Sequence, residues 1–301
     1  MSTPISTPHL YAADLAQMLG DPIDLKIFLK QESQQQGRSI KGRVAYAMAM
    51  RSRQIGRPII ESSSGNLALG LGYWCGQLGA PRPRCLIDDC CEPSMIDALD
   101  EMGCVVEVVP LTHREREQQS GVLKRISRAR EYVREGYYWP NQYDSAEWIK
   151  VHQETTGPEI WCDDRRYDLV VGAVGTGATM SGVALARPAD SRALVVAVEP
   201  AGSSIFGAPA GPYRVAGAGN PFKPQNYRQN LIDIEVTVDD DSAFLAARTL
   251  RAAGLNIGSS GAMTVVGALR AARQLRGTCH TAVVIVADDG WYENIGTART
   301  E

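Results

Sequence analysis

The 301-residue sequence contains no uninterrupted apolar run of the roughly 18 to 20 residues needed to cross a bilayer, so we expect no membrane-spanning segment. Its first residues lack the basic region, apolar core and small-residue cleavage site of a secretion signal, which predicts a cytoplasmic location. It also lacks an excess of either charge, because 31 Lys and Arg residues stand against 34 Asp and Glu residues. Nucleic-acid binding needs a clear basic excess, and we therefore expect no nucleic-acid partner. The densest basic stretch, residues 113–134, is interleaved with glutamates and predicts a solvated helix face.

The seven cysteines include no C-x-x-C pair, and their number is odd. This pattern is typical of reduced, packed thiols and excludes a disulfide framework or a zinc site as the basis of the fold. Cys90 and Cys91 are adjacent, which is a poor geometry for chelating one ion, so we expect no metal. The histidines have no paired nucleophile nearby in sequence. We interpret His113, His152 and His280 as surface or core residues and His9 as part of a mobile start.

Short Val/Ile-rich runs alternate with segments of helical period, which predicts an α/β fold whose parallel strands are covered on both faces. The expected strands lie at residues 58–60, 84–87, 105–109, 169–171, 193–198 and 282–286. Two segments do not fit this alternation. Residues 137–161 are rich in aromatic and polar side chains, and we interpret them as a crossing between two α/β units. Residues 202–224 are rich in glycine and proline and predict a long functional loop.

Three loops contain residues that could carry chemistry. The first ends at Lys41, which we expect at the start of a helix. A cation there opposes the positive end of the helix dipole, which disfavours the protonated amine, and a neutral amine is what Schiff-base chemistry requires. An ordinary surface lysine would give the same local pattern.

The second loop, Glu61-Ser62-Ser63-Ser64-Gly65-Asn66, follows a predicted strand and precedes a helix. Hydroxyl groups and backbone N–H groups at a helix N-terminus form a natural cradle for a carboxylate or phosphate. Ordinary N-capping by Ser and Asn is the alternative.

The third loop, Gly175-Thr176-Gly177-Ala178-Thr179, also lies between a strand and a helix and is suited to binding a phosphate. A dinucleotide site is the competing interpretation. Glu199 has the spacing of a ribose-binding acid, but Met180 occupies the position that requires a small residue.

Taken in chain order, these loops resemble one family. Ser39-Ile40-Lys41-x-Arg43, Ser63-Ser64-Gly65-Asn66, the loop at 175–179 and Ser259-Ser260-Gly261 are similar to motifs of fold type II pyridoxal-phosphate (PLP) enzymes of the cysteine synthase and cystathionine β-synthase family. The similarity extends from about residue 25 to 289. It implies two three-layer α/β domains with mainly parallel sheets and a cofactor cleft between them. The larger, cofactor-binding domain would comprise residues 1–34 and 149–301, and the smaller, mobile domain residues 35–148.

The resemblance also implies a role for each motif. Lys41 would bind PLP as a Schiff base and move the Cα proton of the substrate. The other cofactor-binding residues would be Asn66, Gly175, Thr176, Gly177, Ala178, Thr179 and, facing the pyridine nitrogen, Ser259. The substrate-binding residues would be Ser62, Ser63, Ser64, Gly65, Asn66, Gln142 and Tyr143. Taken without the resemblance, Ser259 could be only a helix cap and Tyr143 only a packed aromatic residue.

A serine facing the pyridine nitrogen does not stabilise a protonated ring, which favours loss of a β-substituent through an aminoacrylate over transamination. The expected reaction is therefore β-replacement on O-phospho- or O-acetyl-L-serine, with an amine or a thiol as the nucleophile, in a protein that is a homodimer by analogy. Tyr143, the serine cluster and residues 202–207 resemble the subgroup that makes 2,3-diaminopropionate precursors. A cysteine synthase proper is the first alternative. An NAD-dependent oxidoreductase and, because of Gly42 and the unusual residues 288–292, a non-catalytic regulatory relative are alternatives of other classes.

Overall fold

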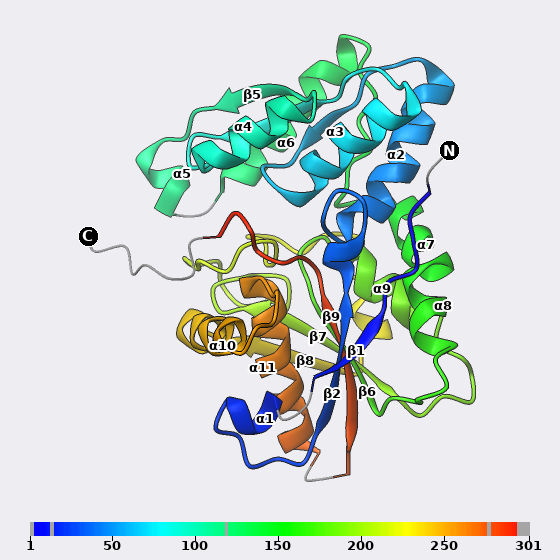
Figure 1. Cartoon of the computed structure of the whole chain (residues 1–301). Coiled ribbons are helices and arrows are strands. Elements are labelled where there is room, and N and C mark those ends of the chain that lie inside the picture. The colour runs from blue at the N-terminus through cyan, green and yellow to red at the C-terminus, as the bar shows by residue number, and fades with distance from the viewer. Residues whose placement is uncertain (1–2, 13–14, 118–119, 276–277, 294–301) are drawn as a thin grey trace. The chain divides into compact units, whose positions relative to one another are not determined.

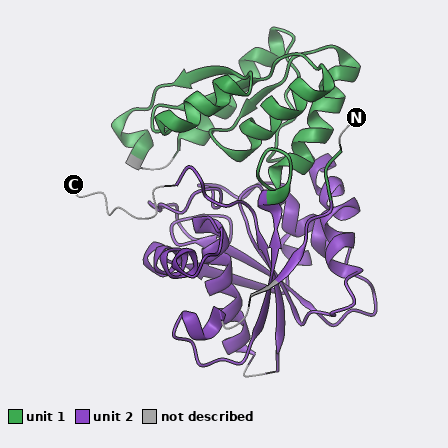
Figure 2. Ribbon diagram, viewed as in Figure 1, with its two compact units in different colours: residues 1–5, 34–145 green, residues 6–33, 146–301 purple. Residues whose placement is uncertain are grey.

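The computed structural model describes residues 3–12, 15–117, 120–275 and 278–293, and the chain divides into two compact units (Figure 1, Figure 2). Unit 1 comprises residues 1–5 and 34–145, and unit 2 comprises residues 6–33 and 146–301. The units divide at 5/6, 33/34 and 145/146, whereas the expected domain boundaries lie at 34/35 and 148/149. The first residues belong to unit 1 because Ile5 is tied to it: the Ile5 backbone N–H donates to Gln35 Oε1 at 3.2 Å.

Unit 2 is built on a six-stranded sheet in the order β1-β2-β9-β6-β7-β8. Only β1 runs antiparallel to its neighbour, and the other strand pairs are parallel. The strands are β1 His9–Ala12, β2 Lys26–Gln31, β6 Leu169–Ala173, β7 Leu194–Pro200, β8 Ile234–Val238 and β9 Thr281–Val286. The central strands are Val- and Ile-rich and buried, as expected for a parallel sheet covered on both faces.

Helices cover both faces of this sheet. In Figure 1, α1, α10 and α11 lie on one side of it, and α7, α8 and α9 lie on the other. Their bounds are α1 Leu15–Met18, α7 Glu147–Glu154, α8 Thr156–Trp161, α9 Ala178–Leu185, α10 Asp240–Ala252 and α11 Ser259–Gln274, with 3₁₀ turns η1 Glu32–Gln34 and η2 Gln229–Leu231. The largest apolar cluster of this unit joins α10 and α11 to the sheet, so the loops that leave the sheet start from a packed support.

Unit 1 has a parallel three-stranded sheet in the order β3-β4-β5. Its elements are β3 Ile60–Ser62, β4 Arg84–Asp88, β5 Val105–Val109, α2 Lys41–Ile55, α3 Asn66–Leu78, α4 Pro93–Glu101, α5 His113–Glu117 and α6 Gly121–Arg134. Helix α6 packs on β3 and β4, and α2 packs along α3. Residue Tyr138 forms a parallel bridge to Ile59, which extends the edge of this sheet just before the strand β3 begins.

The predicted α/β class with mainly parallel sheets is confirmed, and the predicted strands at 105–109, 169–171 and 282–286 lie in β5, β6 and β9. The chain passes from unit 1 to unit 2 between residues 145 and 146, which confirms the interpretation of residues 137–161 as a crossing between two α/β units. The segment also contains the helices α7 and α8, whose buried residues include Trp148, Ile149 and Ile160. One expectation is wrong: the mobile start assigned to His9 is instead strand β1, which pairs with β2.

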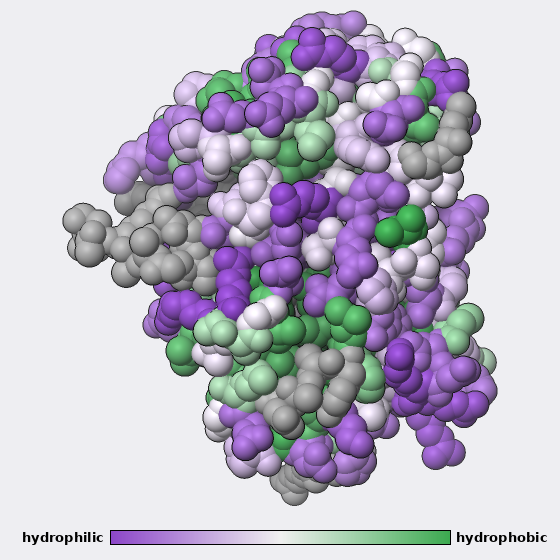
Figure 3. Space-filling view, viewed as in Figure 1, coloured by the Kyte–Doolittle hydropathy of each residue, from purple (hydrophilic) through white to green (hydrophobic). Residues whose placement is uncertain are grey.

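The basic stretch forms a solvated face as expected, with Arg114, Arg116, Arg130 and Arg134 exposed. Arg125 on α6 is the exception and is only 8% exposed. No helix within the described ranges is long and apolar enough to cross a membrane. The face drawn in Figure 3 carries hydrophilic and hydrophobic side chains intermixed.

Candidate active site

Lys41 is the first residue of α2, as expected. The backbone around it packs closely against neighbouring segments at two glycines, Gly42 and Gly70. A Cβ added to Gly42 would lie 2.1 Å from the carbonyl oxygen of Gln36, so only glycine lets the preceding loop approach the helix this closely. A Cβ on Gly70 of α3 would lie 3.5 Å from the Lys41 carbonyl oxygen. Trp74 on α3 adds a bond from its indole Nε1 to the Gly42 carbonyl oxygen at 2.9 Å. Unit 1 therefore brings the start of α2 against the first turns of α3.

The serine loop links β3 to α3, and Asn66 is the first residue of α3. The Ser63 hydroxyl accepts a bond from the Ala68 backbone N–H at 3.3 Å. The N-cap of α3 is Gly65, which has no side chain to satisfy the first N–H groups, and a Cβ there would meet nothing within 4 Å among the described residues. The loop therefore presents a helix N-terminus to open space, which is the arrangement expected of an anion site.

Ser62 differs from the other two serines of this loop because it is completely buried. Its hydroxyl accepts a bond from Arg125 Nε at 3.2 Å, and Arg125 also forms a short ion pair with Asp88. Tyr143, 6% exposed, is hydrogen bonded to the Ser62 side chain, and burial raises the pKa of its phenol to about 12. Ser62 thus supports the loop from behind, while Ser64 and Gly65 are partly exposed.

Glu61 connects the serine loop to the segment that contains Gln142. Its carboxylate accepts bonds from the Ser62 N–H at 2.9 Å, from Trp139 Nε1 at 3.3 Å and from the Gln142 N–H at 3.2 Å. The Gln142 side-chain amide in turn donates to the Ser62 carbonyl oxygen at 2.8 Å. Burial raises the pKa of Glu61 to about 7. The sequence alone predicted no role for Glu61, since a lone buried acid has no sequence signature.

Cys91 lies beside this loop, with its Sγ 3.7 Å from the Ser64 carbonyl oxygen. Burial raises the pKa of Cys91 to about 11, so it is a neutral thiol. The neighbouring Cys90 is exposed and accepts a contact from Arg116 Nη1 at 3.2 Å. All seven cysteines are free, and no group of three His, Cys, Asp or Glu side chains in the described part of the chain is placed to hold a metal ion.

In unit 2, the loop at 175–179 joins β6 to α9. Gly177 is the N-cap of α9 with a left-handed φ of 85°, and no side chain caps this helix. A Cβ at Gly177 would lie 2.5 Å from Tyr227 Cα, so this position requires glycine for both conformation and space. The first N–H groups of α9, on Ala178 and Thr179, thus lie at an N-terminus that has no capping side chain, which suits an anion.

Residues 216–220 connect this loop to Ser259 within the same unit. The Asn220 side-chain amide donates to the Gly175 carbonyl oxygen at 2.8 Å, and the Gly219 N–H donates to the Val174 carbonyl oxygen at 2.8 Å. The Ala216 N–H donates to the Ser259 hydroxyl at 3.1 Å. The structure therefore brings the loop at 175–179 and Ser259 together through one connecting segment.

Ser259 is the buried first residue of α11, and a carboxylate approaches it from the end of the described chain. Glu293 Oε2 accepts a bond from the Ser259 backbone N–H at 2.8 Å. Burial and the nearby Asp288 raise the pKa of Glu293 to about 7. The second oxygen, Oε1, is buried and has no hydrogen-bond partner among the residues that the structure describes.

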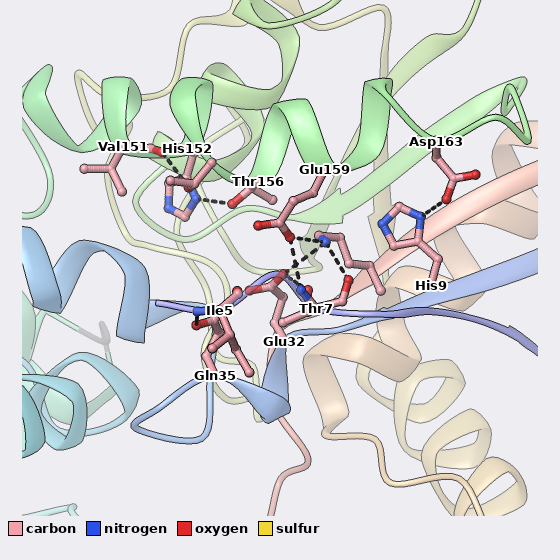
Figure 4. Close-up of polar contacts among 12 residues, drawn as sticks. Ile5, Thr7, His9, Glu32, Gln35, Val151, His152, Thr156, Glu159 and Asp163 are labelled. Atoms are coloured by element: carbon pink, nitrogen blue, oxygen red, sulfur yellow. Dashed lines mark hydrogen bonds and ion pairs between the residues drawn. The ribbon is translucent and has the colours of Figure 1, made fainter. Parts of the chain in front are cut away.

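His152 on α7 lies behind the loop at 175–179 and is 1% exposed. Its Nε2 lies 3.2 Å from Thr179 Oγ1. Its Nδ1 lies 2.9 Å from Thr156 Oγ1 (Figure 4). The sequence alone predicted a surface or core residue for His152, and it is a core residue. The helical spacing of His152 and Thr156 was the available signal, but the contact with Thr179 crosses 27 positions and needs the fold.

The dinucleotide interpretation is not supported. Glu199, its expected ribose ligand, is 1% exposed, and its carboxylate accepts bonds from the backbone N–H groups of Ile205 at 3.1 Å and Phe206 at 3.4 Å. This acid holds the loop at 203–206 in place and is turned away from a ligand.

Comparisons with known proteins found similar sequences and structures. A cysteine synthase from Staphylococcus aureus is 27% identical over 274 residues, covering 88% of this chain and 86% of the relative. A hydrogen sulfide-producing enzyme from Fusobacterium nucleatum has a similar structure, with a TM-score of 0.83, 26% identity and 95% of each chain covered. An O-ureido-L-serine synthase mutant with bound O-ureido-L-serine gives a TM-score of 0.81 at 25% identity, covering 94% of this chain and 88% of that one.

An O-acetylserine dependent cystathionine beta-synthase from Helicobacter pylori shares the fold, with a TM-score of 0.84 at 23% identity over 97% of this chain and 96% of that one. The model of the family described as "Pyridoxal-phosphate dependent enzyme" matches residues 2–288. Because this match spans nearly the whole chain, the protein belongs to the family of pyridoxal-phosphate dependent enzymes.

Proposed function

We propose that the protein uses PLP to replace the β-substituent of an O-activated L-serine with an incoming nucleophile. The family match supports the cofactor, and the printed names of two similar structures refer to O-acetylserine and O-ureido-L-serine. The observation that carries the proposal is in unit 2: a serine, Ser259, and not an acid, starts the buried helix joined to the loop at 175–179. A serine at the ring nitrogen of PLP favours β-elimination chemistry over transamination.

The residues present fit the cofactor. The N-terminus of α9 has no capping side chain, and free N–H groups at a helix N-terminus have the polarity that a phosphate requires. We assign the phosphate to Gly175, Thr176, Gly177, Ala178 and Thr179, the ring nitrogen to Ser259, the 3-hydroxyl to Asn66 and the covalent attachment to Lys41. When bound, PLP supplies an electron sink for the substrate carbanion.

The chain's own residues would carry out the remaining steps. Lys41, once released from the cofactor, moves the proton at the substrate Cα. Ser63, Ser64, Gly65 and Gln142 bind the substrate carboxylate at the N-terminus of α3, where hydroxyl and N–H donors converge. Ser62 and Tyr143, which are buried behind the loop, hold these donors in place. In this proposal unit 1 is the smaller, mobile domain and unit 2 the cofactor-binding domain.

For the nucleophile we propose an amine, giving a 2,3-diaminopropionate-type product, over the sulfide of a cysteine synthase. The resemblance of Tyr143, the serine cluster and residues 202–207 to the subgroup that makes 2,3-diaminopropionate precursors supports this choice. A matrix assay tests it: O-phospho-L-serine and O-acetyl-L-serine are each supplied with sulfide or with L-glutamate, and product is identified by mass spectrometry. We expect the highest kcat/KM with an amine. Sulfide turnover well above amine turnover would assign cysteine synthesis, and no product from either donor would contradict the reaction itself.

We also infer a cytoplasmic homodimer, by analogy with the family alone. Light scattering of the purified protein tests the assembly, and a monomeric mass would overturn it. Fractionation of producing cells tests the location.

A further inference from the structure

The substrate-carboxylate apparatus proposed above consists of two chain segments that are far apart in sequence, the serine loop and residues 141–143. One side chain binds both. Glu61 is the middle residue of β3 and is fully buried. Its carboxylate accepts bonds from the backbone N–H groups of Ser62 and of Gln142, which lies 81 positions further along the chain.

The backbone at Asn141 and Gln142, which bonds the Glu61 carboxylate, has a conformation suited to binding an anion. Asn141 has a φ of 51°, a left-handed conformation that costs a non-glycine residue about 1 kcal/mol or more. Such a residue can turn successive N–H groups toward one point and create a small anion-binding concavity. The N–H groups of both Asn141 and Gln142 bond the Glu61 carboxylate.

The partners of this carboxylate are all N–H donors: the backbone of Ser62, Asn141 and Gln142, and the indole of Trp139. An ionised carboxylate can accept from all of them. A protonated one loses acceptor capacity and gains a hydroxyl proton, which the N–H groups that face it cannot accept. Protonation therefore weakens the connection between the two segments.

We propose that Glu61 is a positioning residue whose ionised carboxylate holds residues 141–143 against the serine loop, so that the grip on the substrate carboxylate tightens as pH rises through neutrality. This inference rests on the proposed function, because that function assigns the two segments to the substrate. Burial places the pKa of Glu61 at about 7, which puts the transition in an accessible range.

Other groups that face Glu61 do not titrate in the same range. Cys85 lies beside it on β4, and its pKa is raised well above the usual value by its hydrogen bond with Cys104 and by burial. Tyr143 has a pKa of about 12. Arg125 on α6, which faces Ser62 and Tyr143, is paired with Asp88.

Binding of an amino acid to the PLP-loaded protein tests the proposal. L-Serine, which lacks a good leaving group, is titrated at pH 6 and pH 8, and the dissociation constant is read from the absorbance of the bound cofactor. A group with a pKa of about 7 is largely protonated at pH 6, so we expect the affinity of the wild type to fall about tenfold more than that of Glu61→Gln. Glu107→Gln, on β5 of the same unit, is the control and should keep the wild-type pH dependence. Equal pH dependence in the wild type and Glu61→Gln would overturn the proposal.

Amide hydrogen exchange on the wild type provides a second readout that needs neither a variant nor turnover. After correction for intrinsic exchange rates, residues 139–143 should be less protected at pH 6 than at pH 8, while β5 should not change. Unchanged protection of residues 139–143 would contradict the role of Glu61. Failure of the wild type to bind L-serine at either pH would count against the proposed function, and the exchange experiment would still decide the arrangement around Glu61.

Discussion

A buried histidine holds one of the threonines assigned to the cofactor phosphate. His152 bonds both Thr179 and Thr156, and replacing it with phenylalanine leaves the buried Thr156 hydroxyl without this partner. Losing a buried hydrogen bond costs about 1–3 kcal/mol, and a change near 1.4 kcal/mol is a factor of ten in binding. We expect His152→Phe to weaken PLP binding about tenfold, measured by fluorescence titration of the apoprotein. His280→Phe, at an exposed position, is the control, and equal affinities in the two variants would contradict the role of His152.

Glu61 also links stability to pH, in the direction opposite to its proposed effect on binding. Its pKa is raised from 4.5 to about 7 in the folded protein, so the unfolded chain loses the proton first as pH rises. Its contribution to the free energy of unfolding is therefore fully present below pH 4.5 and falls by about 3 kcal/mol as pH rises to about 7. Urea denaturation of the wild type and Glu61→Gln between pH 4.5 and about 7 tests this. We expect the free energy of unfolding of the wild type to fall by about 3 kcal/mol relative to that of Glu61→Gln as pH rises over this range. A difference that stays constant with pH would show that Glu61 titrates normally.

At the scale of elements, the contact between α2 and the loop before it fixes the position of Lys41. A methyl group at Gly42 would collide with the Gln36 carbonyl oxygen, and overpacking of this kind costs about 1–3 kcal/mol. A Cβ added to Gly76 within α3 would meet nothing within 4 Å among the described residues. Alanine there should therefore stabilise the helix by about 0.5–1 kcal/mol. Urea denaturation of Gly42→Ala and Gly76→Ala tests this contrast. Two changes of the same sign would mean that the loop does not approach α2 as described.

A buried ion cluster ties the strand β2 to the helix α8 and to the segment before β1 (Figure 4). Lys30 Nζ lies 2.6 Å from Glu159 Oε2 and 3.7 Å from Glu32 Oε1, and Lys30 is 0% exposed. Removing the cation leaves two carboxylates uncompensated, which costs about 3–5 kcal/mol. We expect Lys30→Met to lower the free energy of unfolding by that amount, while Lys26→Met, at an exposed position of the same strand, changes it by less than about 0.5 kcal/mol. Similar effects of both substitutions would contradict this account of the cluster.

The sequence predicted the parallel strands and the loops after them because continuous apolar runs and glycine or serine clusters are local signals. The helices α7 and α8 were not recognised, because each is short and rich in polar residues, and α8 also contains Pro158. Strands β1, β2 and β8 carry fewer local signals, since β1 lies at an edge and β2 contains the buried Lys30. The nearer of its two carboxylate partners is Glu159, 129 positions away, which no local pattern can reveal.

At the scale of the whole molecule, the residues proposed for catalysis are divided between the two units. Lys41, Asn66, the serine loop and Gln142 belong to unit 1, whereas the loop at 175–179 and Ser259 belong to unit 2. The order of these motifs along the chain identified the family, which the match over residues 2–288 confirms. The supporting residues Glu61, His152, Asn220 and Glu293 were not predicted, because their partners lie far away in the sequence.

The central claim is that PLP attaches to the first residue of α2. Reduction of the PLP-loaded protein with borohydride, followed by proteolysis and mass spectrometry of the peptides, tests it most directly. We predict a single PLP-derived adduct on the peptide that contains Lys41, and its loss in Lys41→Ala. An adduct on a different lysine, or a protein that takes up no PLP, would contradict the account.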